Sequence, residues 1–343
     1  MSIQMPMSGP DFALSLVSVA AAAVMWTSSD HVTFSCGLAV VLAAPVVEPF
    51  VRLRVGGEGR TTATCLSLLA LAAAVAFGFA PDSAALAIAA LVVVGGAFPF
   101  HVIQEALRPQ AGPRAFSLLL LSQPGLALAT EILDPQTVTL GVETRTMLTS
   151  WFVLTALVQT GLALCRQDPM RVVFGVGMSQ AALLVAGAMA SEHGFTSEYL
   201  MLAGSDLGLL ALTLLLGDMQ RRHGALRLRP DNGLAEHEPR SAQLFLVAGW
   251  LCAGLPGGIV FFAEDLIFHA LVQRSSWNAA GMVFVCMING IAFYRVYLGV
   301  YCGRMIPGAF AKSVMPPLIS VTVALLVAAV VIFGCMPQAM LPH

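Results

Sequence analysis

Long apolar runs dominate this sequence and leave few folds open to it. Of its 343 residues, 58% are hydrophobic and only 10% are charged, whereas a soluble globular protein carries about 25% charged residues. Because about twenty apolar residues cross a bilayer as one helix, the runs predict an all-α polytopic membrane protein with about 11 transmembrane helices in a single membrane domain, 1–343. The predicted spans are 11–29, 32–51, 61–80, 84–105, 115–132, 146–165, 172–191, 199–217, 242–271, 278–301 and 314–336.

Lys and Arg residues give the predicted helices a direction, because these residues gather at the cytoplasmic ends of membrane helices. The ends that follow odd-numbered spans hold only Arg145 and Arg274, and Arg295 lies inside the tenth span. All the others follow even-numbered spans: Arg52, Arg54, Arg60, Arg108, Arg114, Arg166, Arg171, Arg221, Arg222, Arg227, Arg229, Arg240, Arg304 and Lys312. This bias predicts a multi-pass protein of the cell (inner) membrane with a cytoplasmic N-terminus, an extracytoplasmic C-terminus and a cytoplasmic linker at 218–241.

Glycine and proline interrupt the fourth and ninth spans, near 95–101 and 254–258. A break at membrane depth survives only where it lines a cavity or is buried in protein. The two breaks lie five spans apart, so the two helices run in opposite directions, and matched broken helices in inverted halves are typical of transporters. We therefore predict two inverted five-helix repeats, at about 11–132 and 146–301, with 314–336 as an extra C-terminal helix; the alternative is chance, since Gly and Pro are common in membrane helices. The interrupting residues are Gly95, Gly96, Pro99, Gly254, Pro256, Gly257 and Gly258.

The ninth span also carries two adjacent carboxylates, Glu264 and Asp265. A charge at membrane depth costs a few kcal/mol, and it usually faces a partner or water and serves a function. This segment therefore suggests that the chain moves something charged.

Other classes of function are not expected. The seven cysteines are scattered without a C-x-x-C pair, so small core residues are a better interpretation than metal ligands or disulfides. The sequence has no basic patch with interleaved aromatic residues, which argues against a nucleic-acid partner. We expect no cofactor, no metal and no catalytic or redox site in this chain.

Three motifs near the breaks are similar to those of a known family. Phe98-Pro99-Phe100-His101, followed by Glu105 and by Ala111-Gly112-Pro113, resembles the signature PxHxWLPdAh…aP. Residues 166–180 resemble qxDiKRllAySsvsq, and residues 254–264 resemble GxPGxxxFxgEf. Over roughly 85–305 the chain thus resembles the proton-conducting, antiporter-like membrane subunits of respiratory complex I, membrane-bound hydrogenases and Mrp cation/proton antiporters, as a divergent member without their first three helices.

The resemblance implies a relay of ionisable side chains through the membrane. Glu264 matches the group that ends the relay, and Glu48 stands near the position of a paired glutamate. His101 matches a family histidine, and the ordinary pKa of histidine suits proton exchange. Gln180 stands at a relay histidine position, and Asp206 replaces a histidine of the next helix.

Further polar residues complete the candidate proton or ion pathway. Asp265 would point elsewhere on its helix, toward Arg274 or a partner subunit, and Arg295 would reach the membrane interface. The remaining polar residues could hold water or bond across helices: Gln123, Gln159 and Asn289. The family's lysines, expected near Val94 and near 123–126, are absent.

Each candidate also has a purely structural interpretation. Glu264 could be an interface carboxylate that pairs with an arginine, and Glu48 could be a helix-end charge near Arg52. Asp206 could be a polar contact between helices, and His101 could be held by backbone carbonyls.

Three functions remain open. The first is an antiporter-like membrane subunit of a multisubunit complex that translocates protons, or exchanges H⁺ for Na⁺, with membrane and cytoplasmic partner subunits. The second is the energy-coupling membrane subunit of an inorganic carbon uptake complex with a zinc-containing cytoplasmic partner. The third is a non-conducting structural subunit of a redox complex, which the missing lysines favour.

Overall fold

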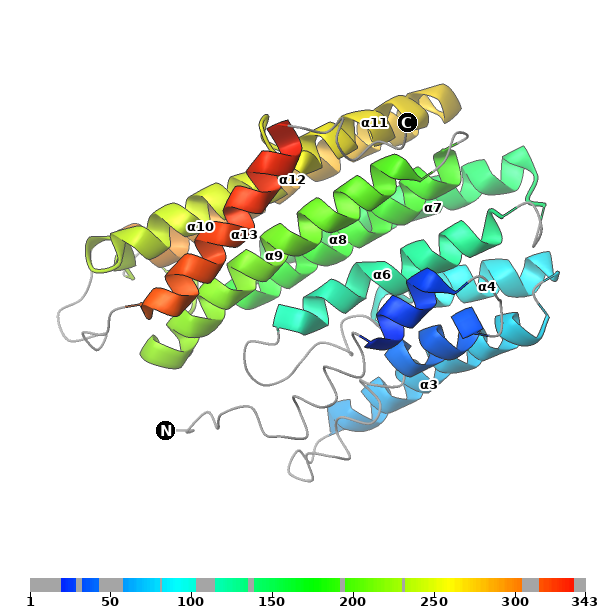
Figure 1. The fold of residues 1–343 in the computed structure, drawn as a ribbon, viewed down its shortest axis with the longest axis horizontal. Coiled ribbons are helices and arrows are strands. Elements are labelled where there is room, and N and C mark those ends of the chain that lie inside the picture. Colours follow the sequence, from blue (N-terminus) through cyan, green and yellow to red (C-terminus); the bar gives the residue numbers. More distant parts are fainter. Residues whose placement is uncertain are drawn as a thin grey trace.

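The computed structural model describes residues 20–28, 33–42, 58–80, 82–102, 115–134, 139–191, 195–229, 232–303 and 315–335, with the backbone alone for 58–67 and 115–122. Every regular element in these residues is a helix (Figure 1). Residues 20–27 and 33–42 are helical. The other helices are α3 (Glu58–Phe79), α4 (Ala84–Val94), α6 (Ala115–Ile132), α7 (Val142–Cys165), α8 (Pro169–Ala190), α9 (Thr196–His223), η1 (Leu234–Glu236), α10 (Pro239–Cys252), α11 (Ile259–Arg274), α12 (Ser276–Tyr301) and α13 (Pro317–Cys335).

The predicted all-α membrane architecture is confirmed in its broad form. A helix overlaps each predicted span from 61–80 onward, and parts of the two spans before it lie outside the described residues. Among the described helices, five are long and apolar enough to cross a membrane: α7, α8, α9, α12 and α13. The segment that joins α9 to α10 contains the short η1 and lies within the predicted linker 218–241.

α8 forms the centre of the bundle, packed against α6, α7, α9, α11 and α12. Its whole apolar stretch is buried. Small residues allow this close packing: a Cβ atom on Gly175 would lie 2.9 Å from Cβ of Ala163 on α7, and one on Gly177 would lie 3.1 Å from Leu209 on α9. Such close approach is the usual basis of helix association in membranes, where burial of apolar surface gives no advantage over lipid.

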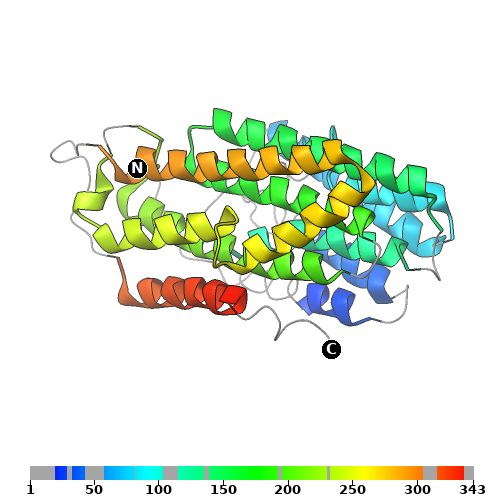
Figure 2. The same cartoon turned by 90° about the horizontal axis from the view of Figure 1, so that it is seen from above.

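α13 lies on the outside of the bundle (red in Figure 2) and packs against α9, α10 and α11. Only Val323 and Val330 of this helix are buried. Near its end, Gly334 lies directly on the start of α11, since a Cβ atom there would come within 2.6 Å of the backbone nitrogen of Ile259. α13 therefore covers the connection between α10 and α11.

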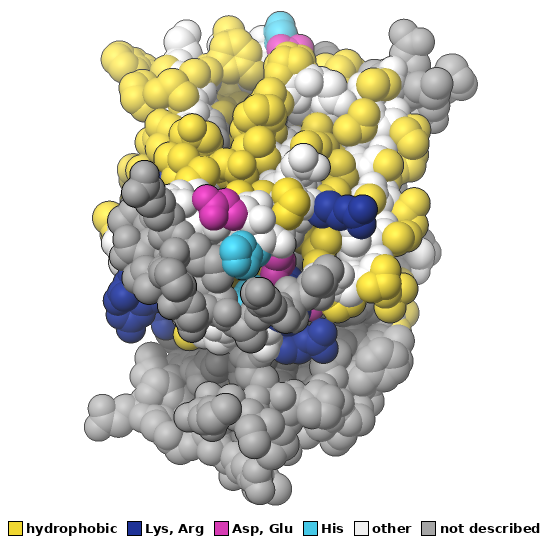
Figure 3. Space-filling model, turned by 90° about the vertical axis from the view of Figure 1, so that its left-hand side faces the viewer, with side chains coloured by type: hydrophobic (Ala, Val, Ile, Leu, Met, Phe, Trp, Pro, Cys, Tyr) yellow, Lys and Arg dark blue, Asp and Glu magenta, His cyan; other side chains and the backbone are white. Residues whose placement is uncertain are grey.

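Basic residues gather at one end of the bundle, where α7, α9 and α12 end and α8 and α10 begin (left in Figure 1). We call it the basic end; Figure 3 faces it and shows arginine side chains with carboxylates and histidines among them. Its residues are Arg166, Arg171, Arg221, Arg222, Arg227, Arg229 and Arg240.

The opposite end, which we call the far end, carries Arg145 and Arg274, the two arginines that follow odd-numbered predicted spans. Nε of Arg145 donates to Met189 O at 3.0 Å, and Nε of Arg274 donates to Ala190 O at 3.2 Å. Both cations therefore lie on the last carbonyls of α8, where the negative end of a helix dipole favours them. Their role in closing α8 accounts for their place at an end that is otherwise poor in basic residues.

Candidate functional site

The second break separates α10 from α11 over the six residues that follow Cys252. Gly254 and Gly257 have φ angles of 73° and 101°, values that glycine adopts without strain. Pro256 has no backbone N–H and so cannot continue the helix. The predicted interruption at 254–258 is therefore a real break, and it leaves the last carbonyls of α10 in need of new donors.

Gln180 on α8 supplies one of those donors. Its Nε2 donates to the carbonyl of Cys252, the last residue of α10, at 2.6 Å, and its side chain is buried. The three preceding carbonyls accept from backbone N–H groups within the turn. An unpaired carbonyl at this depth would cost about 1–3 kcal/mol, so Gln180 fixes the end of α10 against the central helix.

Glu264 lies beneath the same break, one and a half turns into α11. A Cβ atom on Gly254 would lie 2.8 Å from Cδ of Glu264 and closer still to Oε2. The missing side chain of Gly254 thus provides the space that the half-buried carboxylate occupies. The thiol of Cys286 from α12 lies close enough to interact with this carboxylate.

The neighbouring carboxylate has a different environment. The side chain of Asp265 is 55% exposed, and its Oδ1 lies 3.7 Å from Nδ1 of the exposed His269 one turn later. The structure therefore separates the two adjacent acids, with Glu264 at the break and Asp265 on the outer surface of α11.

Asp206 is the second carboxylate of this region. It is 7% exposed on α9, and Nε2 of Gln123 from α6 lies 3.5 Å from its Oδ2. The buried Cys252 lies within electrostatic range of both Asp206 and Glu264. The structure thus brings Gln123 to Asp206 and places Gln180 and Glu264 at the second break.

A second polar group lies beside Gln180. The hydroxyls of Thr160 on α7 and Ser179 on α8 both donate to Oδ1 of Asn289 on α12, at 2.6 and 3.0 Å. Gln159, next to Thr160, is buried, and neither of its amide atoms has a hydrogen-bond partner among the described residues. The expected bonding of Asn289 across helices is confirmed, while Thr160, Ser179 and Cys286 were not expected, because a lone hydroxyl or thiol in an apolar run gives no signal.

The first break follows Val94 at the end of α4 and contains a cis Phe98–Pro99 peptide bond. α7 holds it: the Phe98 N–H donates to Oγ1 of Thr155 at 2.9 Å, and Nε1 of Trp151 donates to Phe98 O at 2.7 Å. His101 ends this break, 7% exposed and stacked on Phe98 with ring centres 5.4 Å apart. Its Nδ1 has no hydrogen-bond partner within the part of the chain that is described.

Two other predicted residues lie away from the breaks. Arg295 donates from Nη1 to the carbonyl of Arg166 at 2.8 Å, so it closes α7 at the basic end. Glu48 lies outside the described residues. Within those residues, no three His, Cys, Asp or Glu side chains lie together as a metal site requires.

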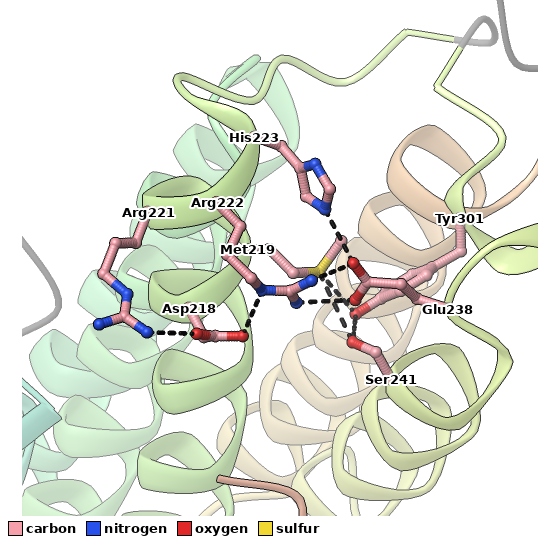
Figure 4. A network of polar contacts seen from close by, with 8 residues as sticks. All are labelled: Asp218, Met219, Arg221, Arg222, His223, Glu238, Ser241 and Tyr301. Carbon is pink, nitrogen blue, oxygen red and sulfur yellow. Dashed lines mark hydrogen bonds and ion pairs between the residues drawn. The ribbon is translucent and has the colours of Figure 1, made fainter. Parts of the chain in front are cut away.

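A buried ionic cluster joins the end of α9 to the start of α10 at the basic end (Figure 4). Arg222 forms ion pairs with Asp218 and Glu238, and His223 contacts Glu238 at 2.8 Å. Burial alone would raise the pKa of the Glu238 carboxyl, but the hydrogen bonds from His223 and Arg222 outweigh it and hold this pKa below its usual value. The cluster therefore fixes the start of α10 against the end of α9.

The sequence of this chain is similar to those of known membrane proteins. Residues 63–289 match the family described as NADH:quinone oxidoreductase/Mrp antiporter, TM. NADH-quinone oxidoreductase subunit N of Acidithiobacillus ferrooxidans is 22% identical over 253 residues, which cover 71% of this chain and 51% of that protein. The chain thus spans about half the length of the curated relatives it matches.

Solved structures share the fold. A chain of the Mrp complex from Dietzia sp. DQ12-45-1b superposes with a TM-score of 0.77 at 18% identity, covering 95% of this chain and 75% of that one. A chain of respiratory complex I from Thermus thermophilus with bound NADH gives a TM-score of 0.76 at 20% identity, covering 97% and 77%. At these identities the likeness establishes the fold alone.

Proposed function

Because this chain belongs to the NADH:quinone oxidoreductase/Mrp antiporter family of transmembrane proteins, we propose that it carries protons across the membrane as an antiporter-like subunit of a multisubunit complex. The observation that carries the proposal is the position of Glu264. Its carboxylate occupies the space that Gly254 leaves at a helix break, and Gln180 holds the end of the preceding helix.

Asp206 and Glu264 are the proton-carrying groups of the proposed path. A carboxylate at membrane depth is costly as an isolated ion, and uptake of a proton or a cation removes that cost. Gln123 and Gln180 can each donate to and accept from water, so they would connect the carboxylates through water molecules. A carboxylate pair also suits Na⁺, which leaves an exchange of H⁺ for Na⁺ within the same proposal.

The proposed path lies in two inverted halves. His101 at the first break would stand on its entry side, while Asp265 and Arg295 would lie outside it. The basic end would face the cytoplasm, in keeping with the location of Lys and Arg in membrane proteins. Partner subunits would supply the energy.

The test is to replace Glu264 by Gln in the complete complex, reconstituted in vesicles, and to follow proton movement with a pH-sensitive dye and Na⁺ movement with its isotope. Asp265→Asn is the matched control, because it removes the neighbouring carboxylate from the exposed surface. We expect Glu264→Gln to abolish transport and Asp265→Asn to retain it. Unchanged transport in Glu264→Gln would refute the path.

A non-conducting structural subunit is the second candidate, favoured by the absence of lysine near Val94 and at 123–126. It predicts that neither variant changes transport by the complex. The proteins that purify with the chain from its native membrane separate a redox complex from one built on a zinc-containing cytoplasmic protein.

A further inference from the structure

Glu198 is a fully buried carboxylate that the proposed path has not used. It is the third residue of α9, and its exposed fraction is 0%. The hydroxyl of Ser197 donates to Oε2 at 2.8 Å, whereas Oε1 has no hydrogen-bond partner among the described residues. An acid at the start of a helix normally lies in water, so its complete burial calls for a reason.

Gly187 on α8 makes the room for this carboxylate. A Cβ atom on Gly187 would lie 3.1 Å from Oε1 of Glu198 and 3.1 Å from Cγ2 of Ile267 on α11. Glu198 and Ile267 therefore meet across the space that Gly187 leaves open. As at Gly254 and Glu264, a glycine stands where a carboxylate enters the packed interior.

Two helices, α8 and α11, connect the surroundings of Glu198 with the second break. Ile267 follows Glu264 by three residues on α11, about 4.5 Å along the helix axis. Gly187 follows Gln180 by seven residues on α8, so both lie on one face of that helix about 10 Å apart. Two neighbouring helices thus lead from the Gln180–Glu264 region to Glu198, toward the far end.

The surroundings of Glu198 suit both of its protonation states. The N-terminus of α9 favours its anion, and the apolar Ile267 favours its neutral form. Tyr199 lies next to it in the chain. Beyond Gly187, Arg145 and Arg274 lie on the last carbonyls of α8, so positive charge stands on the outer side of the carboxylate.

We propose that Glu198 is the last proton-binding group of the path, placed between Glu264 and the water at the far end. This inference rests on the function proposed above. The protonated carboxyl of Glu264 gives its proton to a water molecule, which passes a proton to the Glu198 carboxylate. Glu198 then releases a proton to the water outside, and both carboxylates return to their ionised form.

The simpler role for Glu198 is a helix cap. Glu143 is its matched control, because it also lies in the first turn of a helix, α7, at the same end, but is exposed to solvent. A cap acts on the stability of α9 and not on proton transfer. Glu198→Asp retains an ionisable group at the same place, so it separates proton binding from packing.

The experiment uses the complete complex in vesicles with four variants: Glu198→Gln, Glu198→Asp, Glu143→Gln and Glu264→Gln. We expect Glu198→Gln to slow proton delivery roughly 100-fold, the size of effect that a positioned proton-transfer group produces. Glu198→Asp should recover most of the rate, and Glu143→Gln should match the unsubstituted protein. An unchanged rate in Glu198→Gln, or a loss that Glu198→Asp does not recover, would overturn the proposal.

Infrared difference spectra between acidic and alkaline pH give a second measurement that does not depend on transport. A protonated-carboxyl band should be lost in Glu198→Gln and persist in Glu264→Gln. Its persistence in Glu198→Gln would show that Glu198 does not exchange protons. If Glu264→Gln transports normally, the proposed path fails, and the band still decides whether Glu198 binds a proton.

Discussion

The two glycines of the second break allow the role of Glu264 to be tested with one pair of variants. Both Gly254 and Gly257 have positive φ angles, so an alanine at either position adopts an unfavourable backbone conformation that costs about 1–3 kcal/mol. The two positions differ in what a Cβ atom would meet. At Gly257 it meets no described atom within 4 Å, whereas at Gly254 it meets the carboxylate of Glu264.

The size of the displacement follows from that contact. The Cβ atom of Gly254→Ala would lie 2.8 Å from Cδ of Glu264, and carbon atoms pack at about 3.5–4.0 Å. The carboxylate must therefore move by about 1 Å. Proton transfer needs heavy atoms about 2.6–3.2 Å apart, and a misplacement of this size can cost about 100-fold in rate.

We therefore expect both variants to lose similar thermal stability in detergent, while only Gly254→Ala loses proton transport in vesicles. Stability is measured by thermal unfolding of the purified complex and transport by the dye assay, on the same preparations. Equal loss of transport in both variants would show that backbone strain, and not the position of Glu264, limits the rate. Full transport in Gly254→Ala would refute the assigned position of the carboxylate.

Three further predictions concern the surrounding polar residues. Gln180→Leu leaves the last carbonyl of α10 without its donor, so it should lower the free energy of unfolding by about 1–3 kcal/mol, measured by thermal unfolding against the unsubstituted protein. Glu238→Gln breaks a buried ion pair and should cost about 3–5 kcal/mol at neutral pH. Because the pKa of Glu238 is lowered in the folded protein, the stabilising contribution of its carboxylate is present above the ordinary pKa and is lost as the pH falls through the folded value. The stabilities of variant and parent should therefore converge in acid. Gln123→Lys would pair an ammonium with Asp206 and should slow proton movement in the vesicle assay, since a fixed ion pair holds the carboxylate ionised.

Much of the fold follows from local patterns in the sequence. Apolar runs predict where helices lie, and the Gly254–Pro256–Gly257 stretch predicts a break because its residues disfavour a helix whatever their neighbours are. The adjacent acids could also be told apart, since neighbouring residues on a helix point about 100° away from each other. Such features depend on the chain near each residue, which is why sequence alone suffices.

The site depended on contacts between distant segments. Nothing near Gln180 indicates that its amide holds the carbonyl of Cys252, 72 residues later. Glu198 looks like an ordinary solvated acid at the end of a span, and only the packing of α8 and α11 around it buries the carboxylate. Periodicity and composition do not determine which glycine leaves room for which side chain, so the contacts of these two residues could be found only from the structure.

The contact between Gln123 and Asp206 bears on the lysines that this sequence lacks. Near the position where the resemblance places a lysine, Gln123 lies 3.5 Å from Asp206. An amide donates a hydrogen bond but brings no positive charge, so Gln123 does not offset the negative charge of Asp206 as a lysine at this position would. In the proposed path, an amide at this position leaves the charge of the carboxylate to be balanced by other groups or by the transported proton or cation, whereas a lysine would hold positive charge there permanently.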